Sequence, residues 1–374
     1  MSLALFIGSL ACGCGGGGGI STTPPPTPTV AAPQVQTTAE QNGAQLVSLS
    51  STTAGATIHY TLDGSTPTAT SQIYQAPVLV DSGLAVKAIA ISAGTESNVT
   101  SQSFTMSIPS GTLVWSDEFA NSTGSNAQPS PGVWTYDTGN NGFGNSELEN
   151  YCAWGSSTAP CSTAAPNAYV GIDGVLHIVA EEPSTGVYTS ARMRSQGLFS
   201  FQYGRLEARM KLPEAQGMWP AFWLLGNNIA TINWPACGEL DVMEHIDGND
   251  PPPYFGAPPA GYDWIAGSIH GGASGAELSE SMQYHPSGFS AADWHTYGMI
   301  WSKGEIQYYV DDPSNVYATY KSTDGAFNGK WPFDDGPEFI ILNLAVGGSW
   351  PGAPDATTTF PAEMQVDYVR LYTN

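Results

Sequence analysis

The stretch Glu239-Leu240-Asp241-Val242-Met243-Glu244 places three carboxylates in a segment whose other residues are apolar. The apolar residues predict a buried β-strand, and the side chains of a strand alternate between its two faces. Glu239 and Asp241 would therefore share one face, whereas Glu244 would point away from it. One extra residue in the strand, a β-bulge, restores the phase and is a common device beside active sites. With that bulge, all three carboxylates face one cleft.

Three carboxylates on one face have a cost and a chemical use. Like charges on one face of a sheet repel each other, so such a cluster is disfavoured without a function. Two carboxyl groups on either side of a sugar bond are what glycoside hydrolysis requires. The alternative is a solvated acidic strand edge. It fits poorly with the flanking residues, which are Trp234 and Pro235 before the stretch and His245 after it.

The composition restricts the fold class and the partners. The chain has 374 residues with 10 Lys and Arg against 33 Asp and Glu, a net charge of -23. This charge argues against binding nucleic acid or an anionic membrane surface, and a neutral polymer suits it better. Its 43 Gly, 28 Pro, 11 Trp and 17 Tyr, without long helical periodicity, predict an all-β protein. We expect a monomer.

The first residues predict an export leader and a linker. Residues 1–14 contain an apolar run that is too short to span a bilayer and that ends near Cys12 and Cys14. We expect an export signal, or a lipoprotein leader with one of these cysteines as the anchor, and no transmembrane segment. The protein would then be secreted or attached to the cell surface, a disordered leader being the alternative. Residues 15–32, rich in Gly and then in Thr and Pro, predict a linker.

Two β domains are expected after the linker. Residues 33–107 contain alternating segments such as residues 56–62, followed by turn residues. Residues 111–374 contain many short apolar segments separated by Gly, Pro, Asn and Asp, the pattern of a two-sheet sandwich of the jelly-roll type. The Pro- and Gly-rich segment 248–261 directly follows the acidic strand, so we expect it to form one wall of the cleft.

Aromatic residues near the acidic strand are candidates for lining the cleft. Residues 217–225 are dense in aromatic side chains, and Trp234 precedes the acidic stretch. Indole rings combine an apolar face with a polar N–H, which suits a half-wet groove that binds sugars. We therefore assign Trp219, Trp223 and Trp234 to the cleft and Phe222 to the core.

Three polar residues complete the predicted cleft. His270 lies in a predicted strand that follows the acidic one along the chain, where a cleft role and a buried structural role both remain open. Asn145 follows a Gly-rich turn, and Arg192 is one of few basic residues. Both can hydrogen-bond sugar hydroxyls, although an ordinary ion pair is the alternative for the arginine.

The cysteines suggest one disulfide and one buried thiol. Cys152 and Cys161 are close in sequence within a segment rich in Ser, Ala and Pro, so a small disulfide is expected if the protein is exported. Cys237 lies at the entry to the acidic strand and is predicted to be a buried thiol rather than a nucleophile.

The acidic stretch and its flanks resemble glycoside hydrolase family 16, in particular its bacterial laminarinase-like group. The supporting segments lie at residues 113–119, 199–213, 219–225, 294–297, 308–311, 342–348 and 364–372. The resemblance covers essentially all of residues 113–372. Residues 55–67 are similar to the chitobiase/hexosaminidase C-terminal type of immunoglobulin-like domain, which implies an accessory or spacer role, with sugar binding as the alternative.

The resemblance implies a role for each carboxylate. Glu239 would be the nucleophile, Glu244 the acid/base, and Asp241 would tune Glu239. In such a pair one carboxyl must stay protonated while the other is ionised. The resemblance also implies a structural calcium ion held by Glu118 and Asp367, two surface acids being the alternative, because oxygen ligands suit calcium. No cofactor would be needed for the chemistry.

The activity implied by the resemblance is that of a retaining endo-β-1,3-glucanase, a hydrolase of laminarin-like β-glucan. The nearest alternatives are a mixed-linkage or β-1,3(4)-glucanase, a galactan hydrolase such as an agarase, and a transglycosylase. A non-catalytic β-glucan-recognition protein built on the same sandwich is the alternative from another class. Such proteins lose the catalytic glutamates, and Glu239 and Glu244 are both present here.

Overall fold

Strands form almost everywhere that the sequence alternates or is continuously apolar. The computed structural model describes residues 29–246, 263–273 and 275–374. Within these ranges one short α-helix, α1 (Ile229–Ile232), accompanies the strands. No helix in the described ranges is long and apolar enough to cross a membrane. The predicted leader, most of the predicted linker and the segment 248–261 lie outside the described residues.

Two small sheets make up the N-terminal module, by which we mean residues 34–103. One sheet has the order β1 (Gln34–Ala39), β2 (Gln45–Ser50) and β5 (Val78–Val80). The other has the order β4 (Gln72–Ile73), β3 (Thr57–Thr61), β6 (Ala85–Ser92) and β7 (Thr95–Glu96), with β8 (Thr100–Ser103) also paired to β6. Their shared core is apolar and includes Val47, Ile58 and Val86. The module therefore has its own hydrophobic core.

A sandwich of two larger sheets follows the module and confirms the predicted jelly-roll type. The cleft sheet has seven strands in the order β10 (Thr135–Asp137), β15 (Arg192–Arg194), β24 (Glu338–Val346), β17 (Met218–Gly226), β18 (Glu239–Glu244), β19 (Ile265–Ala273) and β20 (Ala276–Tyr284). Its paired strands are all antiparallel. The acidic stretch is thus β18, between two long partners.

The outer sheet has ten strands and covers the other side of the core. Its main path is β11 (Glu149–Tyr151), β14 (Val187–Ser190), β13 (Leu176–Ser184), β25 (Ala362–Tyr372), β16 (Gly204–Lys211), β21 (His295–Ser302), β22 (Glu305–Val310) and β23 (Val316–Lys321). Two further strands, β12 (Ala168–Val170) and β9 (Leu113–Asp117), pair with β13 and β25. Apolar side chains from both sheets, among them Phe222, Leu342 and Trp301, fill the space between them. Their burial is the main source of stability for the sandwich.

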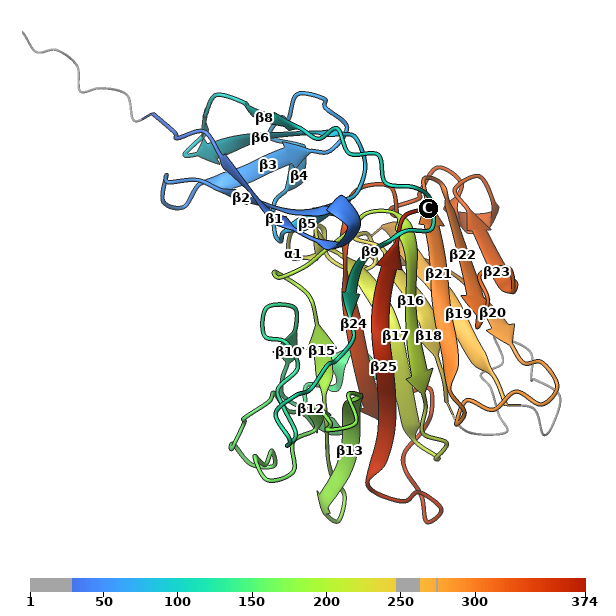
Figure 1. The fold of residues 1–374 in the computed structure, drawn as a ribbon. Helices are drawn as coiled ribbons and strands as arrows, with labels where there is room; N and C mark the ends of the chain where they lie inside the picture. The colour runs from blue at the N-terminus through green and yellow to red at the C-terminus, as the bar shows by residue number, and fades with distance from the viewer. Residues whose placement is uncertain (1–28, 247–262, 274) are drawn as a thin grey trace, which may run out of the picture.

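The module is packed directly against one end of the sandwich (Figure 1). The Leu79 amide donates to the Ser200 carbonyl at 2.9 Å, and the Ser200 amide donates to the Pro77 carbonyl at 3.0 Å. Ala44 and Leu79 of the module belong to the same buried cluster as the core of the sandwich. The module therefore shares a core with the sandwich, which a spacer role does not require.

Candidate active site

A β-bulge in β18 brings the three carboxylates to one face, as the sequence predicts. On one side of β18, Asp241 pairs with Trp223 and Met243 pairs with Phe222, so Val242 is the extra residue. The pairing with β19 shifts over the same residues. Leu240 and Met243 are fully buried in the core. The phase correction therefore turns the apolar residues inward and leaves the acidic residues on the opposite face.

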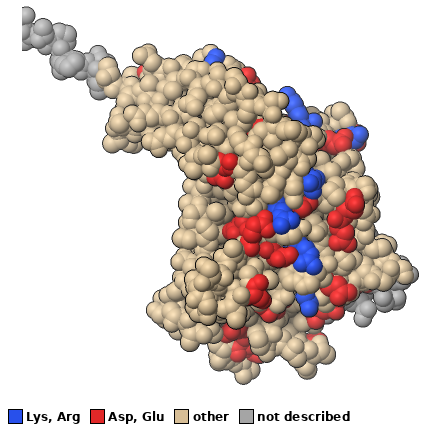
Figure 2. All heavy atoms as spheres, viewed as in Figure 1, with Lys and Arg blue, Asp and Glu red and all other residues tan. Residues whose placement is uncertain are grey.

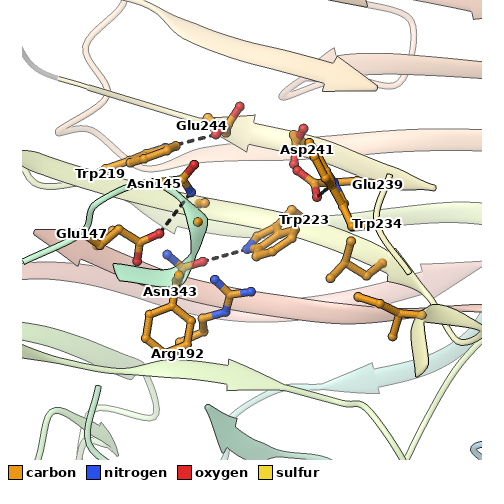
Figure 3. Close-up of a pocket in the computed structure, with 16 residues that line it drawn as sticks. Asn145, Glu147, Arg192, Trp219, Trp223, Trp234, Glu239, Asp241, Glu244 and Asn343 are labelled. Carbon is orange, nitrogen blue, oxygen red and sulfur yellow. Dashed lines mark hydrogen bonds between the residues drawn. The ribbon is translucent and has the colours of Figure 1, made fainter. Parts of the chain in front are cut away.

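Glu239, Asp241 and Glu244 line a cavity of about 370 Å³ on the cleft sheet (Figure 3). The predicted residues Asn145, Arg192, Trp219, Trp223 and Trp234 line the same cavity. Phe222, the aromatic residue assigned to the core, is fully buried instead. The volume lies within the range typical of small-ligand sites.

Each of the two glutamates accepts a hydrogen bond from an indole N–H. Trp219 donates through Nε1 to Glu244 Oε1 at 3.0 Å, and Trp234 donates through Nε1 to Glu239 Oε2 at 2.8 Å. Trp234 keeps 42% of its surface exposed, so it also presents part of its ring to solvent at the cleft. These bonds fix the direction of each carboxylate while leaving aromatic surface for a sugar ring.

Trp223 is held from two sides on the floor of the cavity. Its Nε1 donates to Asn343 Oδ1 at 2.7 Å, and the Arg192 guanidinium lies 4.6 Å from its ring centroid. Arg192 also pairs through Nε with Asp137 at 3.0 Å. The arginine therefore combines both roles considered from the sequence, since it forms an ion pair and lines the cavity.

His270 lies on β19 directly across from β18, although it does not line the cavity. Its Nε2 lies 3.1 Å from Asp241 Oδ2, and its Nδ1 lies 2.7 Å from Glu277 Oε1. Burial lowers the pKa of His270, but its bond to Asp241 and the charges of Asp241 and Glu239 raise that pKa well above the usual value. The imidazole is therefore a cation behind the acidic cluster.

Both glutamates of the cluster have a pKa above the ordinary range. Burial and the charge of Asp241 raise the pKa of Glu239, while His270, the Trp234 N–H and Arg192 act in the opposite direction. Burial, followed by Asp241, raises the pKa of Glu244 well above its usual range, against the lowering effect of His270. Because these groups repel one another, they titrate as a set, and the cluster retains a proton at neutral pH.

One group of potential metal ligands occurs in the described part of the chain. Glu239, Asp241 and His270 offer ligand atoms that all lie within 4.8 Å of one another. The cationic imidazole accounts for this spacing, because it pairs with the carboxylates without needing a metal ion.

The predicted calcium ligands make other contacts. Both carboxylate oxygens of Glu118 accept hydrogen bonds from Arg370, at 2.9 and 2.8 Å, and Asp367 accepts from Arg209 at 2.8 Å. On the face visible in Figure 2, basic side chains are interspersed with acidic ones in the same way. In this arrangement the two carboxylates do not fit a calcium site, and calcium binding by this chain stays a prediction.

Asn343 is a cavity residue that the sequence analysis did not assign. It lies on β24, where it accepts from Trp223 and donates to the Tyr151 hydroxyl at 3.3 Å. Tyr151 in turn donates to Glu147, which also lines the cavity. The signal in the sequence was a single amide within the apolar residues 339–346, since a buried polar side chain needs hydrogen-bond partners.

The cysteines are placed as expected. Cys152 and Cys161 form a disulfide. Cys237 is a buried free thiol, and burial raises its pKa to about 12, which leaves it protonated and unreactive at neutral pH.

Comparison with families of known proteins gives two matches along the chain. Residues 156–370 match the family described as Glycosyl hydrolases family 16, and residues 47–104 match the family described as Fn3 associated. The first match covers most of the sandwich, including β18, and the second covers most of the N-terminal module.

Individual relatives match the sandwich as well. A beta-glucanase of Rhodothermus marinus is 37% identical over 276 residues, which cover 71% of this chain and 86% of the relative. Among solved structures, the laminarinase catalytic domain of Thermotoga maritima is 37% identical with a TM-score of 0.57, covering 71% of this chain and 99% of that one. The endo-β-1,3-glucanase of Pyrococcus furiosus is 33% identical with a TM-score of 0.57, covering 76% and 97%.

Proposed function

This chain belongs to glycosyl hydrolases family 16, and we propose that it is a retaining endo-β-1,3-glucanase that hydrolyses laminarin-like β-glucan. The observation that carries the proposal is the bulged strand β18, which aims Glu239, Asp241 and Glu244 into a cavity walled by indole rings. Relatives named laminarinase and endo-β-1,3-glucanase support the choice of linkage.

Glu244 is the proposed general acid and base. Its raised pKa keeps the carboxyl protonated, so it can deliver a proton to the oxygen of the leaving sugar. After that transfer Glu244 is ionised, and it can accept a proton from the water that attacks in the second step. The hydrogen bond from Trp219 lowers the cost of this ionised state.

Glu239 is the proposed nucleophile. Its carboxylate would attack the anomeric carbon as the bond to the leaving oxygen breaks, giving a covalent glycosyl-enzyme. The Trp234 N–H, the His270 cation and Arg192 all favour the ionised form that the attack requires. Asp241 lies between the two glutamates on the strand and pairs with His270, and its charge raises the pKa of both glutamates.

The aromatic walls of the cavity and its carboxylates, which would repel an anionic polymer, support an uncharged glucan as substrate. Trp219, Trp223 and Trp234 offer faces on which sugar rings can stack, and Asn145 and Asn343 offer amides for hydroxyl groups. The exact linkage preference is the finer part of the proposal, since one structural relative is named a non-specific endo-β-1,3(4)-glucanase.

Parallel product analysis tests the proposal. Laminarin, barley mixed-linkage glucan and agarose are each incubated with one purified sample, and the oligosaccharides released are identified. We expect short β-1,3-linked products from laminarin. Release from both glucans would move the enzyme to the β-1,3(4) class, whereas products from agarose alone would contradict the assignment of the cleft.

Export of the protein is a further part of the proposal. The disulfide between Cys152 and Cys161 supports it, because disulfides persist in oxidising compartments and are rare in the reducing cytosol. Labelling of free thiols in protein isolated from culture supernatant, membrane and cytosol tests this. A fully reduced protein found only in the cytosol would contradict it.

A further inference from the structure

A second cavity lies between the N-terminal module and the sandwich. Its volume is about 850 Å³, within the range of ligand sites, and it is open to solvent. The module is fixed there by the paired backbone of Leu79 and Ser200 and by the contact of the Gln72 amide with the Asp335 carbonyl. The walls therefore come from two domains that share a core, and the cavity is part of the folded protein.

The chemistry of the walls suits an uncharged ligand with many hydroxyl groups. Hydroxyl and amide side chains from both domains line the cavity, among them Thr61, Thr70 and Gln202, while Tyr203 and Ile232 add an aromatic ring and an apolar face. Ile232 is 45% exposed, so part of its apolar surface is open to a ligand. Sugars present this combination of hydroxyl edges and apolar faces.

The charges of the walls argue against an anion. Four aspartates line the cavity against one lysine, Lys303. Two of these acids already accept hydrogen bonds from the protein, since Asp334 accepts from the Gly304 amide at 2.9 Å and Asp63 accepts from the Ser65 amide at 2.9 Å. The one group of three potential metal ligands among the described residues is the Glu239 cluster, so the second cavity is not assigned to a metal ion.

A buried polar atom without a partner also marks the second cavity. Asn228, which lines it, is only 7% exposed, and its Oδ1 has no hydrogen-bond partner among the described residues. An unsatisfied buried acceptor costs free energy, and native proteins usually supply a partner from the protein, water or a ligand. Because this oxygen is inaccessible to solvent, a sugar hydroxyl can donate to it only after the Asn228 side chain turns toward the cavity.

Helix α1 connects the two cavities. Ile229 lines the catalytic cavity, whereas Asn228, Thr231 and Ile232 line the inter-domain cavity. Trp234, which bonds the proposed nucleophile, follows the helix by two residues. One short segment thus forms a wall of both cavities. A polymer bound in one cavity therefore lies next to the other cavity.

We propose that the inter-domain cavity is a second binding site for a β-1,3-glucan chain, adjacent to the catalytic cavity across helix α1. The choice of β-glucan as the ligand rests on the proposed function. A long chain bound at both sites gains affinity because the second contact is intramolecular. The module would then act as part of the substrate-binding surface.

Titration of an inactive variant tests the second site. Glu239→Gln protein is titrated calorimetrically with laminaritriose, which is short enough for each site to bind its own molecule. We expect two molecules per chain. Adding Ala69→Trp, which fills the cavity from the module side, should reduce this to one, because Ala69 lines the cavity with a methyl group only. Ala54→Trp, an exposed module position outside the cavity, is the matched control and should keep two.

Several outcomes would overturn the inference. One molecule bound in both double variants would remove the second site, and equal binding of maltotriose there would remove its assignment to β-glucan. If the Ala69→Trp variant is unfolded, hydrogen–deuterium exchange of Glu239→Gln protein, measured with and without laminaritriose, replaces it as the test. We expect residues 61–73 to gain protection when laminaritriose is bound. No gain of protection there would contradict the second site. Hydrolysis of laminarin by the unaltered protein tests the proposed function separately.

Discussion

The two cavities on either side of helix α1 bury different kinds of groups. The catalytic cavity crowds Glu239, Asp241 and Glu244 beneath indole rings, where burial and mutual repulsion raise the pKa of both glutamates. The inter-domain cavity also holds four aspartates and one lysine, but they are spread over two domains among hydroxyl, amide and apolar side chains. The difference shows that a reactive site requires crowded ionisable groups whose burial and mutual repulsion shift their pKa values. A binding site for a neutral polymer requires only matched polar and apolar surface.

The largest effect is expected from Glu239→Gln. The amide keeps the size of the side chain but cannot attack the anomeric carbon, so turnover of laminarin should fall to background. Laminaritriose binding should remain, because both cavities keep their walls. Glu305→Gln on the outer sheet is the matched control and should keep full activity. Turnover near that of the unaltered protein in Glu239→Gln would remove the nucleophile assignment.

A smaller loss is expected from Glu244→Gln. The variant cannot donate a proton to the leaving oxygen, and general acid catalysis is worth about 10²–10⁴-fold in rate. An aryl glucoside with an acidic phenol as leaving group needs little protonation, so its first step should be much less affected than that of laminarin. Measured rates on the two substrates check this. Equal losses on both would show that Glu244 is not the acid.

The contact between the module and the sandwich is probed by stability. Leu79 is 7% exposed and packs into the core of the sandwich, whereas Leu49 is 6% exposed and packs only within the module. Each Leu→Ala change should cost about 2–5 kcal/mol of unfolding free energy. Calorimetric scans should show Leu79→Ala lowering the transition of the sandwich and Leu49→Ala lowering that of the module. An unchanged sandwich transition in Leu79→Ala would mean that the shared core contributes nothing to its stability.

A shift in pH dependence is expected from His270→Asn. The His270 cation lowers the pKa of Glu239 and Glu244, so its removal raises both pKa values. Glu239 must lose its proton to act, so the acid limb of the kcat/KM profile should move to higher pH. Glu244 must keep its proton to act as the acid, so the alkaline limb should also move to higher pH. His295→Asn, which removes a surface ion pair with Asp311, is the matched control. An acid limb that stays in place would contradict the electrostatic role of His270.

The catalytic cavity could be predicted from the sequence to a large extent because its chemistry fixes residue types. The phase of β18, the need for a bulge and the indoles Trp219, Trp223 and Trp234 all follow from side-chain chemistry. Asn343 was missed because its role depends on which strand lies beside β17.

The inter-domain cavity could not be predicted because it forms where residues far apart in the sequence meet, in part through backbone atoms. The carbonyl of Pro77 and the amide of Leu79 would bond Ser200 with almost any side chains at these positions. The ion pair between Glu118 and Arg370 could not be predicted from the sequence either, because the two residues meet only through the register of β9 with β25. Local patterns carry no information on such long-range partners.

The anomeric configuration of the first product tests the central claim most directly. Proton NMR spectra recorded in the first minutes of laminarin hydrolysis separate the α and β anomers before they equilibrate in water. Attack by Glu239 followed by water activated by Glu244 inverts the carbon twice, so the β anomer should appear first. An α anomer appearing first would mean a single displacement by water, and Glu239 would then not be the nucleophile.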